Sequence, residues 1–124
     1  MKRDWDGFDM SNADKSTYAP FILIRSEHPS LILSDREMSL RFEIFDERKD
    51  EGWMGNGYDW TSIAQIVMEE KLPDVEETVE FDAEAGMFSA IGPLYALERL
   101  GGEMKKVFDD ENLLRDVLNR AEID

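Results

Sequence analysis

A single histidine, His28, and the absence of cysteine narrow the chemistry that these 124 residues can support. Zinc sites of the ordinary kind need several Cys or His ligands, and a thiol nucleophile needs a Cys. A Ser-His-Asp triad would have to use His28, but the sequence has no Gly-x-Ser-x-Gly elbow, and Glu27-His28-Pro29 is typical of a solvated turn. We therefore predict no catalytic residue, no metal site and no cofactor.

Paired carboxylates occur in several places, and each pair could be drawn as the acid and base of a hydrolase. Examples are Glu69-Glu70, Glu76-Glu77 and Asp109-Asp110. Acidic residues are so frequent that no pair stands out, and solvated faces or helix caps account for them. Asp82-x-Glu84 lacks the ligand spacing of a calcium loop, and Gly55-Asn56-Gly57 lacks the Lys-Ser/Thr of a phosphate loop. A small carboxylate-dependent hydrolase is one alternative function, but these residues do not single it out.

The acidic excess is the strongest global feature, with 29 Asp and Glu against 14 Lys and Arg and a net charge of −15. Such a surface repels nucleic acid and anionic membranes, and it attracts basic partners. Solubility alone is the other explanation. The densest acidic stretch has a single Lys71 among its carboxylates, which are Glu69, Glu70, Asp74, Glu76, Glu77, Glu80, Asp82 and Glu84. We therefore predict a basic protein as partner, and neither nucleic acid nor a membrane.

The segment Glu51–Trp60 combines three glycines with two tryptophans and a tyrosine. Aromatic side chains with polar tips are enriched in the centres of protein interfaces. Trp60 begins a helical apolar stripe and is expected in the core, whereas packing explains Trp53 least well. The predicted partner-binding residues come from this segment and the acidic stretch: Trp53, Asn56, Tyr58, Asp59, Glu76, Glu77, Asp82 and Glu84. Whether the loop and the hairpin lie at the same end is left open.

Hydrophobic periodicity predicts one α+β domain over residues 1–124, with an irregular arm at 1–19. Strands are expected at 21–24, 31–33, 40–44, 79–81 and 87–91, with a helix at 59–72 and helices at 93–108 and 110–121. The third strand depends on the alternation of Leu40, Phe42 and Ile44 with charged residues. The element order is βββ-α-ββ-αα, in an antiparallel sheet with helices on one face.

Several details of these elements are predicted or left open. Asp59 or Asn56 caps the first helix, and Gly101-Gly102 either kinks one long helix or separates two short ones. The predicted core residues are Phe42, Ile44, Trp60, Val67, Phe81, Phe88, Leu97, Leu100, Leu114 and Val117.

No secretion or membrane signal is visible in the sequence. The first residues lack the apolar core of a signal peptide, and the longest apolar stretch is Phe21–Ile24. We therefore expect a cytoplasmic protein. Its oligomeric state is not indicated.

Four blocks of the sequence carry a family resemblance: Ser30–Asp35, Leu40–Phe45, Gly55–Trp60 and Phe81–Phe88. Together they resemble immunity protein family 51 of bacterial polymorphic toxin systems, over most of the chain from about Phe21 to the last helix. The Gly-Asn-Gly-Tyr-Asp-Trp block and the Phe-Asp-x-Glu-Ala-Gly-Met-Phe hairpin are the more specific parts. The resemblance implies a protein that binds and neutralises a cognate toxin domain without catalysis. It implies no particular contact residues, and the N-terminal arm lies outside it.

The charge and the resemblance agree. A toxin that attacks nucleic acid tends to have a basic cleft, so the acidity favours a basic toxin domain and makes a nuclease one candidate. The alternative is an acidic nucleic-acid mimic, or a regulator that binds a basic DNA- or RNA-binding protein. A toxin domain encoded immediately upstream is expected only for an immunity protein.

Overall fold

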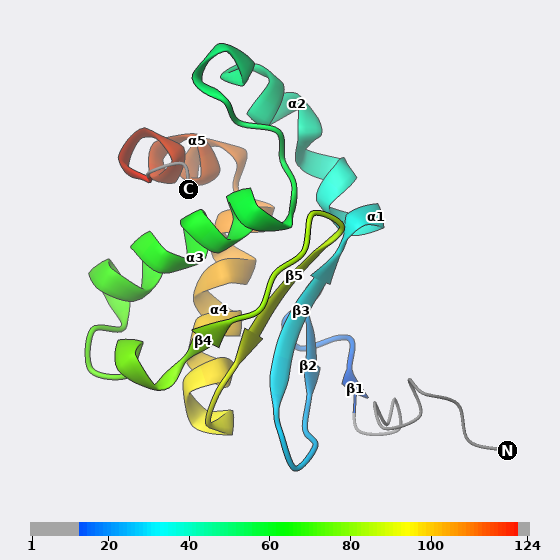
Figure 1. Ribbon diagram of the computed structural model, residues 1–124, viewed down its shortest axis with the longest axis vertical. Helices are drawn as coiled ribbons and strands as arrows, with labels where there is room; N and C mark the ends of the chain where they lie inside the picture. Colours follow the sequence, from blue (N-terminus) through cyan, green and yellow to red (C-terminus); the bar gives the residue numbers. More distant parts are fainter. Residues whose placement is uncertain (1–12, 122–124) are drawn as a thin grey trace, which may run out of the picture.

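The segments at 22–24, 30–34 and 87–91 form the centre of a five-stranded antiparallel sheet in the computed structural model, which describes residues 13–121 (Figure 1). The strand order is β1-β2-β3-β5-β4. The strands are β1 (Ala13–Asp14), β2 (Ile22–Ile24), β3 (Ser30–Ser34), β4 (Glu80–Phe81) and β5 (Met87–Ile91). The predicted α+β class with an antiparallel sheet is confirmed.

Strands β3 and β5 pair along their full length although they are distant in sequence. The register places Leu31 opposite Ala90 and Leu33 opposite Phe88, and all four residues are buried. Directly opposite residues share a face of the sheet, so these four form its core face. Helices α3 and α4 pack against this sheet.

The helical segments follow the strands in chain order. They are α1 (Asp35–Met38), η3 (Ser39–Arg41), α2 (Phe42–Asp46), η4 (Lys49–Glu51), α3 (Gly57–Lys71), η5 (Glu76–Thr78), α4 (Leu94–Asp109) and α5 (Glu111–Arg120). Asn56 caps α3 and Asp110 caps α5. Helix α4 continues through Gly101-Gly102 without a break, so these residues belong to one long helix and do not separate two short ones. A Cβ at Gly101 would lie 2.9 Å from the Tyr18 ring, which explains a glycine at that contact.

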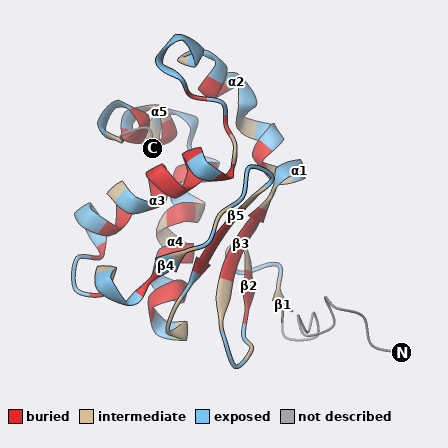
Figure 2. Ribbon diagram, in the orientation of Figure 1, coloured by how far each residue is buried: buried red, intermediate tan, exposed pale blue. Residues whose placement is uncertain are grey.

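The core between sheet and helices is centred on an aromatic cluster. The Trp60 ring lies 5.5 Å from the rings of Phe45 and Phe108 and 6.2 Å from that of Phe21, measured between centroids. Figure 2 shows the buried residues on the inner sides of α3, α4 and the central strands. Predicted core residues that are buried are Ile44, Trp60, Val67, Phe88, Leu97, Leu100, Leu114 and Val117, while Phe81 is only partly buried.

The predicted third strand at 40–44 is wrong. Residues 35–46 form two short α-helices joined by a 3₁₀ turn, and Phe42, predicted in the core, is 47% exposed. Buried residues here are Met38, Ile44 and Phe45, with a spacing of i, i+6 and i+7 that suits a helix and not a strand. The period-2 alternation of Leu40, Phe42 and Ile44 was therefore coincidental.

The predicted irregular arm contains one ordered piece. Ala13 and Asp14 form the edge strand β1, with Ala13 opposite Ile24. The Asp14 carboxylate accepts hydrogen bonds from the backbone N–H groups of Ser16 and Thr17, each 3.0 Å long. Hydrogen bonding by the side chain and the backbone of Thr17, and by the backbone of Ser16, holds the pKa of Asp14 well below its usual range. Residues 1–12 of the arm lie outside the described residues.

Candidate partner-binding site

The glycine-rich loop and the acidic hairpin lie in contact. The Gly57 N–H donates a 2.9 Å hydrogen bond to the Ala85 carbonyl. A Cβ at Gly57 would lie only 1.9 Å from the Glu84 carbonyl oxygen and 2.4 Å from that of Met87. Backbone therefore approaches backbone more closely than any side chain would permit. We call this region, residues 52–58 together with 82–87, the loop–hairpin end.

A buried carboxylate holds the loop in shape. Asp59 is 5% exposed, and its Oδ2 accepts hydrogen bonds from the Met54 and Gly55 N–H groups at 2.6 and 2.7 Å. The Asn56 side chain accepts from the Asp59 N–H at 3.0 Å and caps α3. Gly52 and Gly55 have φ angles of 102° and 83°, which favour glycine. The loop is therefore fixed by its own residues.

Replacement of Asp59 tests this account. Asp59→Ala leaves two N–H groups without their acceptor, and we expect the free energy of unfolding to fall by about 2–3 kcal/mol. Asp59→Asn keeps one oxygen acceptor but loses the charge, so its free energy of unfolding should fall by about half as much. Urea unfolding monitored by tryptophan fluorescence measures both. An Asp59→Ala variant as stable as its parent would show that the carboxylate does not hold the loop.

The predicted site residues of the loop have different environments. Tyr58 is 50% exposed and Asn56 is half-buried, so both are accessible. Trp53 is only 2% exposed, and its ring lies 6.2 Å from that of Phe45. Trp53, predicted to bind a partner, is therefore packed into the fold with little of its side chain accessible. Because a strand was expected at 40–44, Phe45 was not recognised as the residue on which Trp53 packs.

The acidic residues predicted for the site fall into two places. Asp82 and Glu84 are exposed on the hairpin that contacts the loop. Glu76 and Glu77 lie in η5, beyond the C-terminal end of α3, whereas the loop precedes its N-terminal end (Figure 1). A helix of 15 residues is about 22 Å long. The structure does not bring Glu76 and Glu77 together with the loop.

A surface hollow beside the loop was not predicted from the sequence. It has a volume of about 520 Å³ and is lined by Phe42, Glu43, Asp46, Lys49, Trp53 and Met54. Its residues Phe42 and Met54 are 47% and 68% exposed. The available signal was the adjacent pair Ile44-Phe45, because a strand with one wet face would point Phe45 into solvent.

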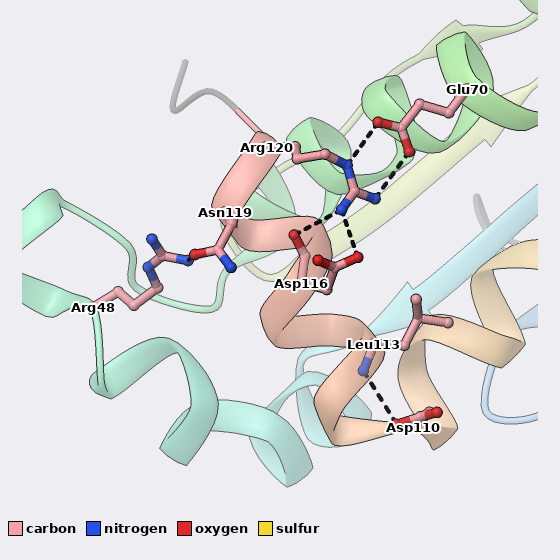
Figure 3. Close-up of polar contacts among 7 residues, drawn as sticks. All are labelled: Arg48, Glu70, Asp110, Leu113, Asp116, Asn119 and Arg120. Atoms are coloured by element: carbon pink, nitrogen blue, oxygen red, sulfur yellow. Dashed lines mark hydrogen bonds and ion pairs between the residues drawn. The ribbon is translucent and has the colours of Figure 1, made fainter.

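Ion pairs are concentrated on the helical side of the described chain. Arg120 of α5 joins Glu70 of α3 to Asp116, as Figure 3 shows, and it lowers the pKa of Glu70 by hydrogen bonding. Arg115 likewise pairs with Glu47 and lowers its pKa. The paired carboxylates are Asp14, Glu47, Glu51, Glu70, Asp74, Glu98, Glu103, Asp109, Glu111 and Asp116.

Other carboxylates near the loop–hairpin end have no such neutralising partner. Within residues 13–121, the side chains of Glu43, Asp46, Asp82 and Glu84 form no ion pair and accept no hydrogen bond. The Asp35 carboxylate lies 4.0 Å from the Cβ position of Gly86, which brings a further negative charge to the hairpin. This end therefore combines exposed apolar side chains with uncompensated negative charge.

Residues 13–121 contain neither a metal-binding cluster nor a membrane-spanning helix. No three His, Cys, Asp or Glu side chains gather there in a way that could hold a metal ion. No helix among them has the length and apolar character needed to cross a bilayer.

Comparison with known proteins gave one match. The family model described as Immunity protein 51 matches residues 21–123, which is most of the chain. Neither the curated proteins nor the solved structures contain a significant match. The match includes the loop, the hairpin and every helix of the described fold.

Proposed function

Since this chain belongs to the immunity protein 51 family, we propose that it binds a cognate toxin domain of a polymorphic toxin system and neutralises it without catalysing a reaction. The family match over residues 21–123 is the observation that carries this proposal. The proposed place of action is the cytoplasm of the cell that makes the toxin, or of a neighbouring kin cell.

The loop–hairpin end is the proposed contact surface. Recognition residues commonly lie on loops that a rigid scaffold holds in place, and the Asp59 hydrogen bonds give this loop such support. Tyr58 and Asn56 are its accessible members, with Asp82 and Glu84 beside them on the hairpin. Trp53 and Asp59 would act from beneath, by holding the loop. Glu76 and Glu77, at the far end of α3, would add to the long-range field.

The proposed toxin surface is basic. A net charge of −15, with uncompensated carboxylates at the loop–hairpin end, favours a partner of opposite charge and speeds its encounter. A nuclease toxin fits this description, because its cleft must attract phosphate. The same charge also supports the second candidate, an acidic regulator of a DNA- or RNA-binding protein, which would show no dependence on a neighbouring toxin gene.

Charge reversal at the hairpin tests the surface. The probe is the cognate toxin domain that the proposal expects to be encoded immediately upstream, and the variant is Asp82→Lys with Glu84→Lys. We expect its association rate to fall at least about tenfold at low salt, and the parent's rate to fall steeply as salt rises, because exposed charges steer encounter. Surface plasmon resonance measures the rates, and co-expression with the toxin measures protection.

The matched control is Glu27→Lys with Glu69→Lys. It changes the net charge equally, but Glu27 lies in the β2–β3 turn and Glu69 near the end of α3. If both folded double variants slow association equally, the net charge acts without a defined surface. A parent on-rate that is independent of salt would mean that the acidity serves solubility. A chain that gives no protection from the upstream toxin would contradict the immunity function itself.

A further inference from the structure

The surface hollow beside the loop has two apolar walls and one charged stripe. We call it the cup, defined by Phe42, Glu43, Asp46, Lys49, Trp53 and Met54. Helix α2 supplies Phe42, Glu43 and Asp46, whose spacings of three and four residues place them along one side of the helix. Trp53 and Met54 supply the opposite wall from the loop.

The walls of the cup are held in place before any partner arrives. A Cβ at Gly55 would lie 2.9 Å from Cδ1 of Phe42, so the loop backbone rests directly on the Phe42 ring. Trp53 packs on Phe45, and the Met54 N–H is held by Asp59. A preformed site avoids the entropy that ordering would consume on binding. Phe42 and Met54 are nevertheless among the most exposed large apolar side chains described here.

The carboxylates of the segment 43–51 differ in their ion pairing. Glu47 pairs with Arg115 and Glu51 with Arg48, whereas Asp50 forms no ion pair with any described residue. Glu43 and Asp46 have no ion pair with any residue in the described range. Lys49 is the basic residue of the lining and also forms no ion pair within that range. The cup thus offers two available carboxylates beside an aromatic and a thioether surface.

We propose that the cup receives an arginine side chain of the toxin, an inference that rests on the proposed immunity function. Its aliphatic stem would lie against Phe42 and Met54, and its guanidinium would meet Glu43 and Asp46. A guanidinium suits this combination because it is weakly hydrated, stacks on aromatic rings and presents donors to two carboxylates at once. Lys49 opposes the incoming charge, so its removal should strengthen binding.

The first test uses the full chain and L-argininamide, observed by ¹H–¹⁵N NMR. We expect saturable shifts of the Met54 amide and the Trp53 indole N–H. Citrullinamide, the neutral isostere, and norleucinamide, the apolar control, should bind at least about threefold more weakly, because the ion pairs are lost. Glu43→Gln and Asp46→Asn should each weaken argininamide binding about two- to fivefold, and Lys49→Gln should strengthen it by a similar factor.

The matched control is Glu27→Gln, which makes the same carboxylate-to-carboxamide change at an exposed residue in the β2–β3 turn. It should leave binding unchanged. Equal binding of argininamide and norleucinamide would overturn the proposal, since the cup would then be a simple apolar site. Shifts of backbone amides spread over the whole acidic surface, or unchanged affinity in the Glu43 and Asp46 variants, would overturn it as well.

The second test uses the upstream toxin domain and Met54→Ala, a change at a largely exposed side chain that should leave folding intact. In the double variant that combines Met54→Ala with Phe42→Ala, we expect the affinity for the toxin to fall at least about thirtyfold. Tyr95→Ala, at an exposed aromatic residue near the start of α4, should have no effect. Full protection and affinity in the folded Met54→Ala and Phe42→Ala double variant would refute the cup as a contact, while the immunity function would stand. If the parent chain itself gave no protection from the toxin, the immunity function would be refuted. The argininamide titration would still report whether the cup binds a guanidinium.

Discussion

Gly57→Ala is expected to destabilise the protein by about 3 kcal/mol or more, because overpacking against backbone has little means of relief. The added Cβ would lie 1.9 Å from the Glu84 carbonyl oxygen and 2.4 Å from that of Met87. Neither atom is the end of a flexible side chain, so the loop and the hairpin must move apart. The 2.9 Å hydrogen bond from Gly57 to Ala85 would then be lost. Urea unfolding measures the stability change, and protection from the toxin should fall with it.

Gly102→Ala is the matched control for this substitution. Gly102 lies inside α4, and a Cβ there would meet nothing within 4 Å. Alanine in a helix interior is better than glycine by about 0.5–1 kcal/mol, so this variant should be more stable than the parent. If Gly57→Ala were as well tolerated as Gly102→Ala, the close contact between loop and hairpin would be contradicted.

Trp60→Ala is expected to cost about 3–5 kcal/mol, the usual range for a large aromatic side chain lost from a core. Trp60 is fully buried and is stacked on Phe108 at 5.5 Å, with Phe45 and Phe21 on other sides. Its removal opens a cavity where sheet, α2, α3 and α4 meet. The melting temperature should fall by roughly 10–20 °C, measured by calorimetry or circular dichroism.

Trp60→Phe separates packing from polarity at the same site. The Trp60 Nε1–H is buried without a hydrogen-bond partner among the described residues, which itself costs stability. Phenylalanine keeps most of the ring contacts and removes this donor, so we expect a loss of only about 1–2 kcal/mol. A Trp60→Ala variant that melted at the parent temperature but no longer bound the toxin would show that Trp60 is a contact residue and not a core residue.

Much of the fold could be predicted because apolar spacing reports burial directly. The predicted strand at 87–91 matches β5, and the helix capped by Asn56 matches α3. The strand predicted at 40–44 failed because three alternating apolar residues are too few to distinguish the two periods. Phe45, next to Ile44, was the sign that the alternation breaks. Strand β1 was missed because two residues carry no periodicity.

The candidate site could be predicted only in part, because contacts between distant segments leave no mark in local sequence. The loop and the hairpin were both expected at the site, but their contact depends on Gly57 meeting the backbone of residues 84–87. Glu76 and Glu77 were grouped with Asp82 by position in the chain, and α3 separates them in space. The cup was missed because Phe42 was assigned to the core on the basis of the mistaken strand.

The position of β5 between β3 and β4 has a consequence for the time that the ribosome needs to make a working molecule. The paired residues are separated by 53 positions at Ser34–Met87 and by 61 at Ser30–Ile91, counted as 87 minus 34 and 91 minus 30. At about 5–20 residues per second, β3 therefore leaves the peptidyl transferase centre roughly 3–12 s before its partner exists. A nascent chain that stops before Met87 has an unpaired β3 edge, no α4 and no α5. Translation must therefore pass Ile91 before the central β3–β5 pair of this fold is able to form.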